Sequence, residues 1–196
     1  MAAGRPPVGY SSDEATMKSR GKIIIVPLGD LDFYQVNKLA ANLSVVFSAG
    51  VDILQGVEIP DEAESQERGQ FYSTIILTKL EMMRQNDNER ILGLTEEDLY
   101  IPTTPFVYGE SDPLSGCAVM SFYRMRLEFY GIAEDEKQIY SRALKEAIHL
   151  VGQLFRLSEC SNPRCVMYRS ATMSDTDAKA DKFCDNCQRR LVRQGV

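Results

Sequence analysis

The 196-residue sequence contains one histidine and no tryptophan. Because His149 is the only imidazole, one chain cannot build a metal site that needs two or three histidines. The sequence also lacks an apolar run of the roughly eighteen residues that a membrane span requires, and residues 1–21 contain no apolar stretch of signal-peptide length. These absences predict a cytoplasmic protein with no membrane partner.

The remaining composition is that of an ordinary globular protein, with 44% hydrophobic and 26% charged residues. This balance excludes collagen-like, wholly disordered and coiled-coil chains. The net charge of −6 argues against general nucleic-acid binding. Chain length and the change of composition along the chain predict a flexible arm at residues 1–20 and a single domain at 21–196. The domain would comprise a sheet–helix body at 21–158 and a four-cysteine module at 159–196.

Hydrophobic periodicity divides the body into alternating strands and helices. Short apolar runs predict strands over Lys22–Leu28, Val51–Ile59 and three segments within Ile91–Arg126, namely ILGLT, PFVYGES and CAVMSFYRM. Apolar residues at helical spacing predict helices over Leu31–Ser48 (capped by Asp30), Gln70–Gln85 and Asp135–Leu157. The turn Asp112–Gly116 favours antiparallel pairing of the last two strands. This order predicts an α/β (α+β) fold whose mixed sheet has an antiparallel edge.

Four of the five cysteines are clustered near the end of the sequence. Cys160 and Cys165 form one close pair, Cys184 and Cys187 form a second, and eighteen residues separate the pairs. In a chain without a signal peptide, such clusters indicate metal ligands before disulfides. Four thiolates fill the tetrahedron of zinc and leave no open position, so the site would be structural. Unligated or disulfide-bonded cysteines are the alternative, and the isolated Cys117 is expected to be a small buried apolar residue.

The segment before and through these cysteines resembles the archaemetzincins. That family carries the signature H-E-x-x-H-x-x-G-x-x-H-C, followed by C-x-M and a later C-x-x-C. This sequence has HLVGQLFRLSEC at His149–Cys160, CVM at Cys165–Met167 and CDNC at Cys184–Cys187, and its GLTEEDLYIP, FVYGES and AVMSFYRMR segments also look like the family's central strands. The resemblance covers residues 22–191. It implies a metzincin-like mixed twisted sheet, a long active-site helix below a cleft along the edge strand, and Met167 at the methionine-turn position.

This sequence departs from the signature at the positions that bind the catalytic zinc and act as the general base. The family's three histidines bind a catalytic zinc, and its glutamate acts as general base. His149 keeps the first position, whereas Leu150 replaces the base, Gln153 the second ligand and Glu159 the third. An alkyl side chain cannot accept a proton, and losing a general base typically costs about two to four orders of magnitude in rate. Gln153 offers only a neutral amide oxygen, a poor zinc donor.

The resemblance therefore implies a zinc metalloprotease, whereas the replaced residues predict a member without peptidase activity. We expect one structural zinc ion, no second catalytic ion, and a vestigial cleft that binds a peptide or protein. In the family a glycine lets the chain turn out of the helix, and here Arg156 stands at that position.

Two alternatives stay open from the sequence. The first is an active zinc metallopeptidase with an atypical site, in which Glu159 ligates the ion and Glu146 replaces the base. The second is a nucleic-acid-binding zinc module, because residues 160–196 carry seven basic and four acidic side chains. The acidic body of the chain, and the few aromatics among these basic residues (Tyr168 and Phe183), argue against nucleic acid.

Overall fold

The computed structural model describes residues 21–126, 128–131, 133 and 135–195, so the arm expected at residues 1–20 lies outside the described residues. The isoleucine-rich run KIIIVPL forms β1 (Lys22–Leu28), which is buried from its second residue onward. It pairs in parallel with β2 (Val51–Ile53) on one side and β5 (Glu89–Thr95) on the other. A strand covered on both faces needs a continuous apolar sequence, which explains this run.

The main sheet has five strands in the order β2-β1-β5-β9-β8. β9 (Cys117–Ser121) pairs in parallel with β5, and β8 (Gly109–Asp112) pairs antiparallel with β9, from Gly109 opposite Met120 to Asp112 opposite Cys117. The mixed sheet with an antiparallel edge is therefore confirmed. Cys117 is fully buried, as expected, and burial raises the pKa of its thiol to about 11.

A smaller sheet stands beside the main one, with its strands in the order β3-β4-β6-β7. Its members are β3 (Glu64–Ser65), β4 (Gln70–Tyr72), β6 (Leu99–Ile101) and β7 (Thr104–Val107). The single strand predicted for PFVYGES is therefore wrong. The segment divides at Tyr108 into β7 and β8, which belong to different sheets.

Three further expectations about element boundaries are wrong. Residues 70–72 form β4 because they pair with β3 and β6, so α2 covers only Ser73–Met83. β2 ends at Ile53, and beyond it the described residues form a single isolated bridge, between Leu28 and Val57. CAVMSFYRM is a strand only to Ser121 and then forms a 3₁₀ turn at Tyr123–Met125.

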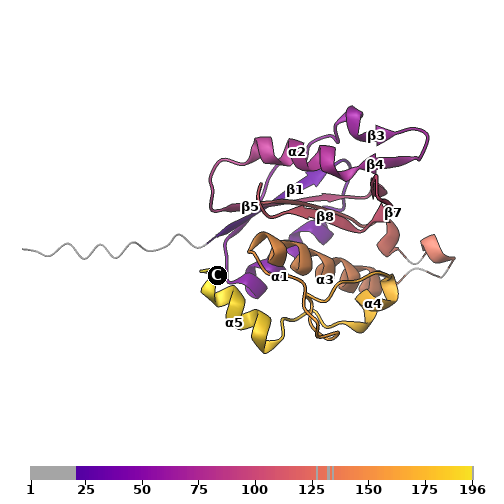
Figure 1. The fold of residues 1–196 in the computed structure, drawn as a ribbon. Helices are drawn as coiled ribbons and strands as arrows, with labels where there is room; N and C mark the ends of the chain where they lie inside the picture. Colours follow the sequence, from indigo (N-terminus) through magenta and orange to yellow (C-terminus); the bar gives the residue numbers. More distant parts are fainter. Residues whose placement is uncertain (1–20, 127, 132, 134, 196) are drawn as a thin grey trace, which may run out of the picture.

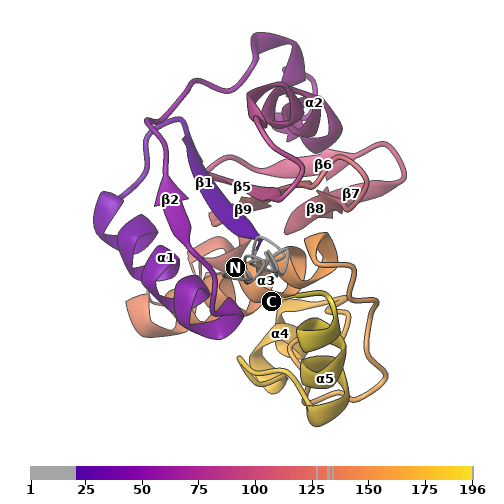
Figure 2. The same cartoon turned by 90° about the vertical axis from the view of Figure 1, so that its left-hand side faces the viewer.

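Helices cover both faces of the main sheet (Figures 1 and 2). α1 (Phe33–Phe47) and α3 (Glu136–Leu154) share one core with one face, and α2 shares a second core with the other. Asp32, and not Asp30, caps α1, because its carboxylate accepts from the Tyr34 amide. Asp135, the predicted first residue of this helix, is the N-cap of α3, and α3 ends three residues before the predicted Leu157.

The segment after α3 carries α4 (Met173–Ala178) and α5 (Asp185–Arg193) and packs below α3 (Figure 1). Cys165, Met167, Cys187 and Leu191 belong to the same apolar cluster as β1, β5 and α3. The cysteine-bearing segment therefore continues the core of the body. Among the described residues, no helix combines the length and hydropathy of a membrane span.

Candidate functional site

The four clustered cysteines meet at one point below α3. Their Sγ atoms all lie within 4.8 Å of one another, and the Sγ atoms of Cys160 and Cys184 are 3.8 Å apart. Four sulfurs at the usual Zn–S distance of about 2.3 Å form a tetrahedron with edges of about 3.8 Å. The cluster therefore has the dimensions of a closed four-thiolate zinc site, and all four cysteines are free of disulfides.

Backbone amides donate hydrogen bonds to two of these sulfurs. The Cys184 amide donates to Sγ of Cys165 over 3.3 Å, and the Asn162 amide donates to Sγ of Cys160 over 3.5 Å. The backbone amide of Cys187 is the main cause that lowers the pKa of Cys184 to about 7. Burial raises the pKa values of Cys165 and Cys187. A bound cation would offset that burial, so the donor set fits zinc.

A buried lysine lies beside the cysteine cluster. Lys179 is only 2% exposed, and its Nζ donates to the Tyr168 carbonyl oxygen over 3.2 Å. Burial lowers the pKa of Lys179, while the nearby Glu146 and the thiol of Cys165 act in the opposite direction. Sequence reasoning counted Lys179 among the basic residues of this segment and did not predict its burial. Its one sequence signal is a lysine flanked by two alanines, Ala178 and Ala180.

A cleft of about 640 Å³ lies between α3, the edge strand β8 and the C-terminal segment. One helix face supplies its floor, because the lining residues of α3 recur at helical spacing: Glu146, His149, Leu150 and Gln153. The residues from Thr104 to Ser111, in β7 and β8, form one wall. Glu159 and the stretch Arg169–Ala171 complete the lining. The structure thus brings His149, Leu150, Gln153 and Glu159 to one cleft.

His149 is held as a neutral imidazole with a defined tautomer. Its Nδ1 lies 3.1 Å from the Val166 carbonyl oxygen, and a carbonyl can only accept, so Nδ1 carries the proton. Nε2 is then the acceptor. Burial is the main cause that lowers the pKa of His149, and Glu146 partly opposes it. The side chain is therefore uncharged near neutral pH and presents an acceptor from α3.

The two residues that follow on the same helix face are already engaged with β8. A Cβ built on Gly109 would lie 2.6 Å from Cδ1 of Leu150, so Leu150 packs directly on the edge-strand backbone. Oε1 of Gln153 accepts a hydrogen bond from the Ser111 hydroxyl over 2.7 Å. An apolar contact and a hydrogen bond thus join α3 to the edge strand.

The remaining positions of the signature, Arg156, Met167 and Glu159, lie near the end of α3. Arg156 has φ = +62°, in the left-handed region that favours glycine, so its position has the backbone shape the resemblance implies. Met167 lies beneath α3, because a Cβ on Gly152 would lie 2.6 Å from its Sδ. Glu159 is half exposed, and its carboxylate lies 3.9 Å from Nε of Arg169.

Comparisons with known proteins identify the family of this chain. A family model described as Peptidase family M54 matches residues 34–193. The archaemetzincin of Methanocaldococcus jannaschii is 37% identical over 175 residues, covering 89% of this chain and 95% of the relative. The archaemetzincin of Pyrococcus furiosus is 35% identical over 178 residues, covering 88% and 93%.

Solved structures show the same fold. A zinc-dependent peptidase from Methanocorpusculum labreanum matches with a TM-score of 0.79 and 30% identity, covering 86% of this chain and 99% of that chain. The archaemetzincin of Archaeoglobus fulgidus, complexed with malonate, matches with a TM-score of 0.73 and 31% identity over the same shares. With the matched family model and relatives of this length and identity, the chain belongs to peptidase family M54, the archaemetzincins.

Proposed function

We propose that this chain is a non-catalytic archaemetzincin that binds a peptide segment in its cleft and holds one structural zinc at its four cysteines. The observation that supports the proposal is that two residues of α3, at catalytic positions of the family, make structural contacts with β8. Leu150 stands where the family has its base and packs on Gly109, and Gln153 stands where the family has its second ligand and accepts from Ser111.

The residues of the cleft do not fit a catalytic zinc ion. Catalytic zinc sites use three protein ligands, mostly imidazole, carboxylate or thiolate. Here Nε2 of His149 is the one imidazole donor. The Gln153 oxygen is neutral and already hydrogen-bonded, and the half-exposed Glu159 lies near a competing guanidinium, that of Arg169. We therefore derive no hydrolytic step for this cleft.

The cysteine cluster does fit a metal, with a different role. Four thiolates around zinc leave no position for water or substrate, so a bound ion would supply folding energy and no chemistry. The cluster would join the loop after α3 to the start of α5, and the buried ammonium of Lys179 would offset part of its negative charge.

The shape of the cleft favours an extended peptide. Within the described part of the chain, β8 pairs only with β9, and Gly109, Glu110 and Ser111 of β8 line the cleft. An unpaired strand edge offers backbone donors and acceptors to an added strand. The neutral Nε2 of His149 can accept a hydrogen bond from such a peptide, and the amide nitrogen of Gln153 can donate one, because only its oxygen is engaged by Ser111.

Metal content and peptidase assays test the non-catalytic part of the proposal. After dialysis against a mild chelator, elemental analysis should give one zinc per chain. Peptide substrates should show no turnover that His149→Ala abolishes. Two retained zinc equivalents, or turnover lost with His149, would contradict the proposal and favour an active metallopeptidase.

Hydrogen exchange tests the binding part. Pools of N-acetylated random octapeptides should slow exchange of the β8 amides and leave those of the exposed turn around Asp87 unchanged. Protection by single-stranded nucleic acid, with a steep salt dependence, would instead favour the nucleic-acid alternative.

A further inference from the structure

Glu146 is a largely buried residue whose carboxylate has no hydrogen-bond or ion-pair partner among the described residues. Its side chain belongs to a residue only 7% exposed, and among the described residues it has neither a hydrogen bond nor an ion pair. Buried charged groups are nearly always paired, because removing a carboxylate from water is costly. The Glu146 oxygens are not among the fully buried side-chain atoms that lack a partner, so they keep accessible surface, and an unpaired carboxylate there is open to a ligand.

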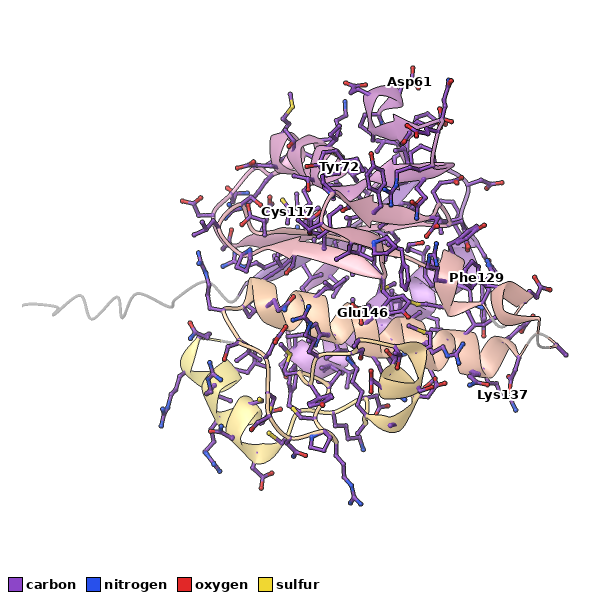
Figure 3. The ribbon with its side chains drawn as sticks, turned by 45° about the vertical axis from the view of Figure 1, so that its right-hand side comes forward. Asp61, Tyr72, Cys117, Phe129, Lys137 and Glu146 are labelled. Atoms are coloured by element: carbon purple, nitrogen blue, oxygen red, sulfur yellow. The ribbon has the colours of Figure 1, made fainter. Side chains whose placement is uncertain are left out.

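The carboxylate belongs to the cleft and not to the apolar core. Glu146 lies midway along α3, which runs between the sheet and the C-terminal segment (Figure 3). It lines the cleft on the same helix face as His149 and Gln153. A ligand that enters the cleft can thus reach Glu146.

The lysines beside this part of α3 are engaged with backbone carbonyls, and Arg169 of the cleft lies 3.9 Å from Glu159. Lys179 donates to the Tyr168 carbonyl, and Lys145 donates to the carbonyl oxygens of Thr176 and Asp177. His149 is neutral because burial lowers its pKa. The charge of Glu146 raises the pKa of Lys179, but the two side chains form no ion pair.

The other carboxylates of the cleft differ from Glu146 in having partners. Glu110 accepts hydrogen bonds from the hydroxyls of Ser73 and Thr74. Glu159 is half exposed and lies 3.9 Å from Arg169. Glu146 is therefore the cleft carboxylate that is free to bind a ligand. Because it is negatively charged, its best partner is a cationic hydrogen-bond donor.

Resting on the proposed peptide binding, we propose that the cleft selects peptides that bring an ammonium or guanidinium group to Glu146. A lysine or arginine side chain supplies such a group, and so does a free peptide amino terminus. A charge-assisted hydrogen bond in a partly dehydrated site is shorter and stronger than one between neutral groups. The apolar part of a long basic side chain would pack along Leu150.

Positional-scanning peptide pools test this selectivity on the full-length, zinc-loaded protein. Each pool is an N-acetylated octapeptide mixture, random except for one fixed residue: lysine, arginine, norleucine or glutamate. Norleucine is close to lysine in length and lacks the charge. At the preferred position, the lysine or arginine pool should bind about tenfold or more tightly than the norleucine pool, the effect of one charged hydrogen bond. A norleucine pool with a free amino terminus separates the terminal source from the side-chain source.

Matched variants then assign the effect to Glu146. Glu146→Gln should remove the preference for the basic pools while the norleucine pool keeps its affinity. Glu136→Gln removes a carboxylate from the same helix outside the cleft and should keep the preference. Melting temperatures measured alongside detect a structural role. Uniform loss of affinity for every pool with Glu146→Gln, together with a fall in melting temperature, would mean that Glu146 supports the fold only, and this inference would be wrong.

The remaining outcomes separate this inference from the proposed function. If all pools bind equally well to the unmodified protein, peptide binding stands and the selectivity is wrong. If no pool binds, the proposed peptide binding fails and the selectivity fails with it.

Discussion

The Ser111 hydroxyl donates to Oε1 of Gln153 over 2.7 Å and so joins the edge strand to the long helix. The bond spans 42 positions of sequence and lies at the position where the family has its second histidine ligand. It means that the replacement of histidine by glutamine is accommodated by a specific partner. Reversing the replacement is therefore a direct test of how this helix face works.

Restoring the signature should create a second metal site. Leu150→Glu, Gln153→His and Glu159→His together supply two more imidazoles and a carboxylate around His149, while Ser111 loses its acceptor. We expect elemental analysis to rise from one to two zinc equivalents per chain. If no second equivalent binds, even with Arg156→Gly added to relax the +62° backbone, the correspondence between α3 and the family's ligand helix is wrong.

Loss of one clustered cysteine should release the structural metal. Cys184→Ser removes a thiolate from a group whose sulfurs lie within 4.8 Å of one another. Structural zinc contributes on the order of 10 kcal/mol in small modules, so the melting temperature should fall sharply and zinc should be lost. Cys117→Ser, a change at the buried cysteine outside the cluster, should lower stability but keep one zinc. Full zinc and full stability in Cys184→Ser would show that these cysteines do not hold the ion.

The contact between Gly152 and Met167 should appear as coupling between two substitutions. Gly152→Ala places a Cβ 2.6 Å from Sδ of Met167 and should cost about 1–3 kcal/mol of unfolding free energy. Met167→Ala alone should cost about 2–5 kcal/mol, because Met167 is fully buried. Combined, the cavity accepts the new methyl group, so the double variant should lose less than the sum. Strict additivity in urea titrations would mean that the two residues do not touch.

The ion pair between Arg142 and Asp177 should make stability depend on pH. The Arg142 guanidinium donates to both Asp177 oxygens, over 2.8 and 2.6 Å, and this bonding is the main cause that lowers the pKa of Asp177 below 3.8. A lowered folded-state pKa stabilises the protein above the unfolded value, and that contribution is lost as pH falls through the folded value. Asp177→Asn should therefore cost about 1–2 kcal/mol at pH 7, since Asp177 is partly exposed, and much less near pH 3.

Urea titrations of both proteins at several pH values measure this difference. The matched control is Asp181→Asn, at an exposed position of the same segment, which should change stability little at any pH. A constant difference between the unmodified protein and Asp177→Asn from pH 7 to pH 3 would contradict the assignment.

Elements with a strong local pattern were predictable from sequence. The apolar run of β1 and the helical stripe of α3 are long, and their periods are unambiguous, so their positions follow within three residues. Residues 70–72 are different. They continue the helical pattern of α2 backward, yet they form a strand because Phe71 and Tyr72 pair with Leu99 and Tyr100. That pairing depends on residues nearly thirty positions away, which local periodicity cannot encode.

The candidate site was likewise predictable from sequence only in part. Cysteine spacing and the family signature point to the thiol cluster and to the positions His149, Leu150, Gln153 and Glu159. The contacts that give these residues their state come from other elements. Val166 fixes the tautomer of His149, and Ser111 engages Gln153. Such contacts join residues that are distant in sequence, so they and the burial of Lys179 can be seen only in the folded chain.

The position of β1 in the sheet has a consequence for the order of folding. The first described strand lies between β2 and β5, and β5 in turn needs β9 to cover its far edge. A nascent chain that has not yet reached Cys117 therefore exposes the apolar edge of β5, at Ile91–Leu94, to other chains. The antiparallel β8–β9 hairpin is the one local pairing of this sheet, and its parallel pairs must close long loops. Synthesis from the N-terminus thus leaves the sheet incomplete until the last of its strands has emerged, and during that interval the chain is most exposed to aggregation.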